Sequence, residues 1–316
     1  MKRLSLIVLF FGVLVLTMAR SSVTPAQTPS VVSTRASATV IRRTSTVTPS
    51  APATAHTSLP KASNTPQIVN PSPAVDDRHL VATPTRGWEY HPPGEISVPI
   101  LLYHHIGESQ AHPRYFVSPQ QFKAQMSSLW KWGYTTIPIS LLVRAIQEGA
   151  ELPPKPVVIT FDDGYREVYQ EALPVMEQYG FVGTLYVIQD QVGVSGYLNA
   201  DQLRKLIESG WEIGSHSKTH ANLRKAGVNL VEEVINSRLA LESLLSTPVL
   251  TFSYPYGSAS PYLKEYVQQA GYTSAVGVGT LSRHSRNTAY YLSRLEVRGG
   301  YDLLDFSRLL RGENPP

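Results

Sequence analysis

The sequence predicts an α/β fold, a distorted (β/α) barrel of about seven strands that occupies the chain from Trp88 onward. Short apolar runs alternate there with amphipathic segments, which is typical of a mostly parallel sheet covered by helices. Seven or eight such runs fall within about 220 residues, and this density fits a barrel better than an open sheet. No G-x-G-x-x-G or G-K-[ST] loop follows any run, so dinucleotide-binding and P-loop folds are excluded.

The expected strands are continuous apolar runs, as buried parallel strands require. They cover 98–104, 156–161, 183–188, 211–216, 249–254, 272–276 and 291–297. Ser118 opens the first expected helix, because Pro119 follows it and Gln121 stands at the capping-box position. Further helices are expected through 171–176, 202–209, 230–245 and 263–270, with a short helix at the end of the chain.

The charge is divided unequally along the chain, although the total is +4. Residues 1–86 hold nine Lys or Arg against two Asp, whereas residues 87–316 hold 19 Lys or Arg against 22 Asp or Glu. The expected folded part is therefore slightly acidic, and it lacks the basic surface that nucleic-acid binding needs. We expect no nucleic-acid partner.

The first part of the chain is expected to be an export segment and a spacer. Residues 1–20 combine a basic start with an apolar run over 4–19, which is typical of a signal peptide or membrane anchor. Residues 21–87 are expected to be a disordered linker, since 28 of the 60 residues in 21–80 are Ser, Thr or Pro. The expected catalytic domain is 88–316, exported or tethered to the outer face of the cytoplasmic membrane, with the cell envelope as its surroundings.

Cysteine is absent, which excludes disulfides, iron–sulfur clusters and thiol nucleophiles together.

Polar clusters instead follow the expected strands, where barrel enzymes have their catalytic residues. The first is Asp162-Asp163, at the end of 156–161. A bound cation would relieve the repulsion between adjacent carboxylates and let one of them take a proton. The alternative is a plain Asp-Asp-Gly turn between strand and helix.

The second cluster contains His216 and His220, which follow the strand expected at 211–216. Histidines four residues apart can both reach one metal ion, and Asp163 completes a set of two histidines and one carboxylate. Such a site suits one divalent metal, with zinc the first choice and other divalent transition metals possible. The alternative is a pair of solvated loop histidines.

The third cluster is 253–257, Ser-Tyr-Pro-Tyr-Gly, directly after the strand expected at 249–254. Proline and glycine fix an irregular loop there, and rigid backbone N–H groups in such a loop can stabilise an oxyanion. The alternative is an ordinary turn.

TFDDG (160–164), HSKTH (216–220) and YPYG (254–257), in this order, resemble the NodB-homology polysaccharide deacetylases, carbohydrate esterase family four. The resemblance covers roughly 98–300. It implies that Asp162 is the catalytic base and that Asp163, His216 and His220 hold the metal. It also implies that the backbone N–H of Tyr256 stabilises the oxyanion.

The sequence departs from the commoner members of that family at two places. An arginine that steadies the base is missing ahead of YPYG, and we expect Arg294 to replace it rather than to be a surface charge. A late histidine motif for the catalytic acid is also missing, but 100–104, ILLYH, supplies an equivalent near the front. This layout resembles a circularly permuted subgroup that includes poly-N-acetylglucosamine deacetylases. It makes His104 the expected acid, with His105 pointing away because strand side chains alternate.

The resemblance implies hydrolysis of N-acetyl groups on an amino-sugar polysaccharide, either an exopolysaccharide of the poly-N-acetylglucosamine type or peptidoglycan. We expect the protein to be a monomer. Two alternatives remain: an inactive sugar-binding module at the cell surface, and a metal-dependent amidase with another substrate. A faint D-x-x-D motif at Asp302 and Asp305 is interpreted as part of the terminal helix.

Overall fold

The structure is a computed structural model, and it describes residues 87–313 and 315. The segments expected as export signal (1–20) and linker (21–87) lie outside these residues, apart from Gly87. No helix in the described range is long and apolar enough to cross a membrane.

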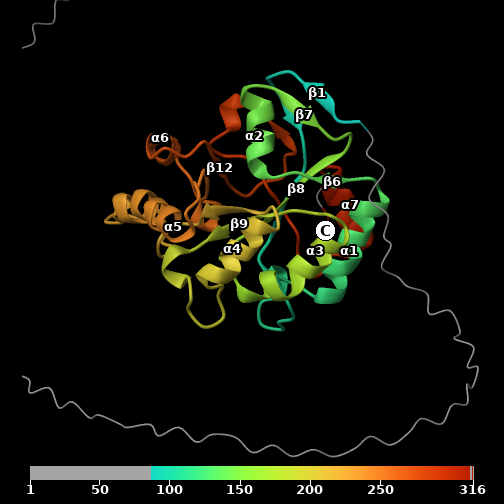
Figure 1. Cartoon of the computed structure of the whole chain (residues 1–316), viewed down its shortest axis with the longest axis horizontal. Helices are drawn as coiled ribbons and strands as arrows, with labels where there is room; N and C mark the ends of the chain where they lie inside the picture. Colours follow the sequence, from blue (N-terminus) through green and yellow to red (C-terminus); the bar gives the residue numbers. More distant parts are fainter. Residues whose placement is uncertain (1–86, 314, 316) are drawn as a thin grey trace, which may run out of the picture. The chain divides into compact units, whose positions relative to one another are not determined.

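A parallel sheet forms the centre of the described domain (Figure 1). Its strand order is β12-β11-β10-β9-β8-β3-β14. These strands are β3 (Ile100–Tyr103), β8 (Pro156–Phe161), β9 (Thr184–Val187), β10 (Glu212–Ser215), β11 (Thr251–Ser253), β12 (Ser274–Val276) and β14 (Leu295–Glu296). β6 (Thr135–Thr136) pairs with β8 outside this path. Two isolated parallel bridges, Val276–Leu292 and Gly279–Leu295, join the two ends of the sheet. The predicted distorted barrel is confirmed.

Helices surround this sheet (Figure 1). They are α1 (Pro119–Lys131), α2 (Ile139–Gln147), α3 (Leu173–Gln178), α4 (Ala200–Glu208), α5 (Ser237–Leu245), α6 (Pro261–Gln269) and α7 (Leu303–Leu310). Two π-helical segments, η2 (Val168–Ala172) and η4 (Val231–Asn236), lead directly into α3 and α5. Short 3₁₀ turns are η1 (Pro113–Tyr115), η3 (Gln189–Gln191), η5 (Pro255–Gly257) and η6 (Arg286–Thr288).

Three small strand pairs complete the described fold. They are β1 (Glu89–His91) with β7 (Ala150–Leu152), β2 (Ile96–Ser97) with β13 (Arg283–His284), and β4 (His105–Ile106) with β5 (Phe116–Val117). The first two are antiparallel and the third is parallel.

Helix ends follow the local sequence where capping residues are present. The Ser118 side chain accepts from the Gln121 N–H, and the Gln121 side chain accepts from the Ser118 N–H, as the capping box predicted. Asp302 caps α7 by accepting from the Asp305 N–H at 2.8 Å. The interpretation of this motif as a terminal helix is confirmed.

Strand alternation separates two hydrophobic clusters. Ile100 and Val158 belong to the cluster that includes the apolar face of α2, whereas Leu101 and Ile159 belong to the larger cluster beneath the other helices. Asp162 is an even number of residues from Val158, so the same alternation directs it toward the inside of the barrel. The fold thus brings a carboxylate into the barrel at the carboxyl end of β8.

Candidate functional site

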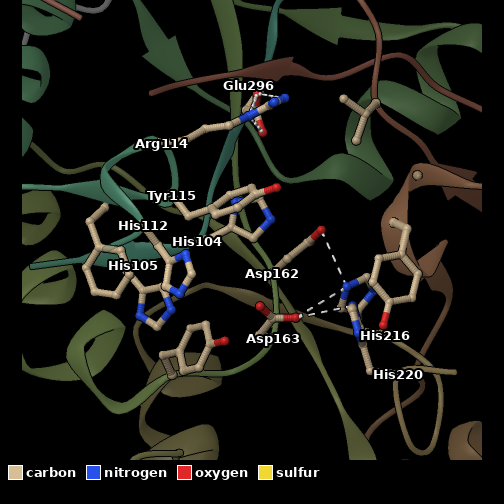
Figure 2. A pocket seen from close by; sticks show the side chains of 15 residues that line it. His104, His105, His112, Arg114, Tyr115, Asp162, Asp163, His216, His220 and Glu296 are labelled. Carbon is tan, nitrogen blue, oxygen red and sulfur yellow. Dashed lines mark hydrogen bonds and ion pairs between the residues drawn. The ribbon is translucent and has the colours of Figure 1, made fainter. Parts of the chain in front are cut away.

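A cavity of about 520 Å³ opens at the carboxyl ends of the strands (Figure 2). Its walls bring together residues from all three motifs and from the segment after β3. They are His104, His105, His112, Arg114, Tyr115, Phe116, Asp162, Asp163, Tyr165, His216, His220, Tyr256, Gly257, Val278 and Glu296.

Asp163, His216 and His220 meet at one side of this cavity, with one ligand atom from each within 4.8 Å of the others. Asp163 Oδ1 lies 3.5 Å from His216 Nε2 and 3.6 Å from His220 Nε2. This oxygen is buried without a hydrogen-bond partner among the described residues, which is costly unless a cation binds it. The set of two imidazoles and one carboxylate therefore fits a divalent metal.

The histidines are prepared for metal binding by their surroundings. His216 Nδ1 lies 2.8 Å from the Ser253 carbonyl oxygen, which can only accept, so Nδ1 carries the proton and Nε2 is free. Burial, and then the neighbouring His216, lower the pKa of His220 below its ordinary value. A lower pKa keeps His220 neutral, and the neutral imidazole is the form that binds a metal.

The backbone around the site adopts conformations that are unfavourable for side-chain-bearing residues. Asp163, Ser217, His220 and Tyr256 have φ angles of 74°, 65°, 62° and 60°. The fifth non-glycine residue of this kind in the described range is Ser246, at the end of α5. Such strain clusters at functional sites because the surrounding structure must hold it in place.

Arg294 reaches the site from the segment preceding β14, and its side chain is fully buried. Its Nη1 donates to Asp162 Oδ1 and its Nη2 to Asp162 Oδ2, each at 2.7 Å. Nε donates to the Gly277 carbonyl at 2.9 Å, and Nη2 also lies 2.9 Å from the Ser253 hydroxyl. Arg294 therefore pairs with Asp162, the carboxylate for which an arginine partner was expected.

Asp162 is buried but kept ionised. Burial alone would raise its pKa, yet the Arg294 guanidinium, together with His216, holds the pKa of Asp162 well below its usual range. Ser253 contributes a further hydrogen bond, from its hydroxyl to Oδ2 at 3.2 Å. Asp162 is therefore a fixed carboxylate, with Oδ2 lying 3.7 Å from His216 Nε2.

His104 lies in the cavity directly after β3, with its ring 5.1 Å from that of Tyr115 in an edge-to-face arrangement (Figure 2). Burial lowers the pKa of His104, although Asp162 and Asp163 oppose this shift. A lowered pKa makes the protonated imidazole a stronger acid, which suits a group that donates a proton.

The expectation that His105 points away from the site is wrong. β3 ends at Tyr103, so strand alternation does not continue through the two histidines, and both line the cavity. The His105 ring is stacked between those of Phe116 and Tyr165, with centroids 3.9 and 3.7 Å away. Its Nδ1 lies 2.5 Å from Glu167 Oε1, so its protein environment differs from that of His104.

Tyr256 lies on η5, where its left-handed backbone sets the bend of the Pro-Tyr-Gly turn. Its side chain is exposed, and its ring lies 4.6 Å from that of His220. The residue expected to supply an oxyanion N–H is therefore adjacent to the metal-ligand set.

Sequence reasoning missed the wall formed by Arg114, Tyr115 and Glu296. Arg114 Nη2 pairs with Glu296 Oε2 at 2.6 Å, although the two residues are 182 positions apart. The segment carrying Arg114 has no motif of its own, and the strand expected at 291–297 does not indicate which residue Glu296 would meet, so no sequence signal marked this contact.

Comparisons with known proteins find relatives among the polysaccharide deacetylases. Residues 149–275 match the family model of polysaccharide deacetylases. The YxkH protein of Bacillus subtilis (strain 168) is 28% identical over 206 residues, which cover 64% of this chain and 72% of YxkH. The poly-β-1,6-N-acetyl-D-glucosamine N-deacetylase of Staphylococcus aureus (strain MRSA252) is 22% identical over 261 residues, which cover 73% of this chain and 89% of that protein.

Solved structures show the same architecture. A polysaccharide deacetylase from Bacillus cereus superposes with a TM-score of 0.62 at 26% identity, covering 68% of this chain and 69% of the other. The deacetylase PplD of Streptococcus pyogenes, solved with acetate, shares the fold with a TM-score of 0.62 at 22% identity, covering 70% of this chain and 99% of the other. Residues 149–275 thus form a polysaccharide deacetylase domain of the NodB type, and the chain is a hydrolase of amide bonds.

Proposed function

We propose that this enzyme removes N-acetyl groups from an amino-sugar polysaccharide in a metal-dependent reaction that releases acetate. The observation that carries the proposal is the position of Asp162, which Arg294 fixes beside the Asp163, His216 and His220 set in one cavity. A sugar-binding module needs neither a metal-ligand set nor an ionised carboxylate next to it. This arrangement therefore favours catalysis over binding alone.

Asp163, His216 and His220 would hold the metal, with zinc the first choice for two imidazoles and a carboxylate. A divalent metal bound there supplies Lewis-acid chemistry, polarising an acetyl carbonyl and acidifying water. The open cavity beside these three residues leaves room for the acetyl group.

The chain's own groups carry the proton transfers. Asp162 takes a proton from the attacking water, since its carboxylate stays ionised next to Arg294. The Tyr256 N–H stabilises the oxyanion, a contribution of about 3 kcal/mol for one donor. His104 then protonates the leaving nitrogen, which yields a free amino sugar and acetate.

The position of β3 supports a permuted arrangement of the barrel. β3, which precedes His104, pairs in parallel with both β8 and β14, so the strands of the central sheet that come first and last in the chain are neighbours. A permutation at this point leaves the geometry of the cavity unchanged. Together with the Staphylococcus aureus relative, it favours poly-β-1,6-N-acetylglucosamine over peptidoglycan as the substrate.

The apolar run over 4–19 further supports an enzyme that acts outside the cytoplasm, in or near the cell envelope.

Acetate release tests this proposal. The chelated enzyme and the enzyme with a divalent metal added back are incubated with poly-β-1,6-N-acetylglucosamine, chitin oligomers and peptidoglycan. Metal-dependent release is expected, and it should be fastest from the first polymer. A non-sugar amide is tested in parallel. Absence of release from all four substrates would favour a binding module, whereas release from the non-sugar amide alone would indicate an amidase. The Asp163→Asn variant serves as a control that should be inactive with metal present.

A further inference from the structure

The segment His216–His220, which carries both histidine ligands, is held in a strained shape. Ser217 and His220 have φ angles of 65° and 62°, and neither is a glycine. A left-handed backbone is strained at a residue other than glycine, so other contacts must hold this segment in place. The Gln189 N–H donates to the Ser217 carbonyl at 3.1 Å, which fixes one side of it.

Glu233 fixes the other side from within the π-helical segment η4. Its Oε2 accepts from the backbone N–H groups of Lys218 and Thr219, at 3.1 and 2.9 Å. Its Oε1 accepts from the Thr219 hydroxyl at 2.6 Å. Hydrogen bonds to an ionised acceptor are roughly twice as strong as neutral ones. One carboxylate therefore binds both residues that lie between the two left-handed positions.

The burial of Glu233 distinguishes it from the glutamate next to it. Glu233 is 6% exposed, yet the Lys218 ammonium pairs with Glu232 instead, at 2.7 Å. The Glu232 side chain is 41% exposed. A buried carboxylate is costly unless it is well hydrogen-bonded, and here the partners of Glu233 are the ligand segment itself.

We propose that Glu233 is a positioning residue for the metal site, which sets the separation and direction of His216 and His220 by holding the segment between them. This inference rests on the proposed metal-dependent function. When a residue that orients metal ligands through hydrogen bonds is removed, metal affinity typically falls by about 10-fold to 100-fold.

Zinc affinity of the full chain, measured by competition with a chromophoric chelator, tests the inference. Glu233→Gln keeps the size of the side chain but removes its charge and replaces one of its two acceptor oxygens with a donor. It should weaken zinc binding by about 10-fold to 100-fold. Glu232→Gln is the matched control on the same helical turn, and its affinity should stay within about twofold of the wild type. The visible spectrum of the cobalt-substituted protein should change in Glu233→Gln alone.

Thr219→Val covers the case in which Glu233→Gln does not fold. It removes one of the three hydrogen bonds, at an exposed position, and should weaken zinc binding by about 10-fold. Wild-type affinity in a folded Glu233→Gln protein overturns the inference, and so does wild-type affinity in Thr219→Val if the first variant is unfolded. Failure of the wild-type chain to bind zinc or cobalt would contradict the proposed function itself, which separates the two outcomes.

Discussion

Arg294 and Asp162 form a two-pronged ion pair inside the barrel, with Nη1–Oδ1 and Nη2–Oδ2 distances of 2.7 Å each. Arg294 is fully buried and Asp162 is 3% exposed, so each charge depends on the other for compensation. A planar guanidinium matches a carboxylate in this geometry, whereas an ammonium cannot form both bonds in the same way.

Removing the cation should therefore destabilise the protein. Arg294→Met retains much of the side-chain volume but leaves the Asp162 carboxylate buried and unpaired, which should cost about 3–5 kcal/mol. Urea unfolding at pH 7 measures this loss. Arg298→Met is the control, because Arg298 is 40% exposed in its pair with Glu296, and it should cost about 1 kcal/mol or less. Equal stability of the two variants would mean that the buried pair contributes little.

Asp162→Asn should separate catalysis from metal binding. The substitution keeps the shape of the side chain but removes the base, and kcat should fall by about 10²-fold to 10⁴-fold. Asp162 is outside the set Asp163, His216 and His220, so metal content measured by elemental analysis should stay close to that of the wild type. Asp163→Asn should instead lose the metal. Full activity of Asp162→Asn would contradict its assignment as the base.

The two neighbouring histidines should differ in their effect on turnover. His104→Ala should lower kcat more than His105→Ala, since His104 lies close enough to Asp162 and Asp163 for their charges to act on its pKa. His105 is held by Glu167 and by the stacked rings of Phe116 and Tyr165. The His105→Ala substitution should mainly lower the stability of the protein or raise KM. Steady-state kinetics with a soluble oligosaccharide measures both effects, and the reverse order in kcat would assign the acid to His105.

Those parts of the fold that depend on local pattern could be predicted from the sequence. Continuous apolar runs identified the seven strands of the central sheet, and Ser118 identified the start of α1. α2 was missed because Pro138 stands at its N-cap, where no side chain caps the helix. The two-residue strands carry too few residues for any periodicity to be recognised.

The site was predictable as far as its residues follow strand ends. The ends of β8 and β10 are followed within two residues by Asp162, Asp163 and His216. Because barrel strands end at the same face, the sequence predicted that these side chains lie close together. Other features depend on the folded environment. The left-handed backbone of Asp163 and Tyr256 has no glycine to mark it, and the orientation of His105 depends on where β3 ends.

His284 provides a pH-dependent contribution to stability away from the site. It is 1% exposed, Nε2 donates to the Val98 carbonyl at 3.0 Å, and burial lowers its pKa to about 4. In the unfolded chain His284 takes up a proton near pH 6.5. Its contribution to the free energy of unfolding is therefore fully present above that pH and is lost as the pH falls toward 4. Between pH 7 and pH 5 the loss should be about 2 kcal/mol. His284→Gln keeps a donor for Val98 without a titrating group. The fall in the free energy of unfolding between the two pH values, measured by urea unfolding, should therefore be smaller in this variant than in the wild type by that amount. An identical pH dependence in both proteins would show that His284 does not titrate in this way.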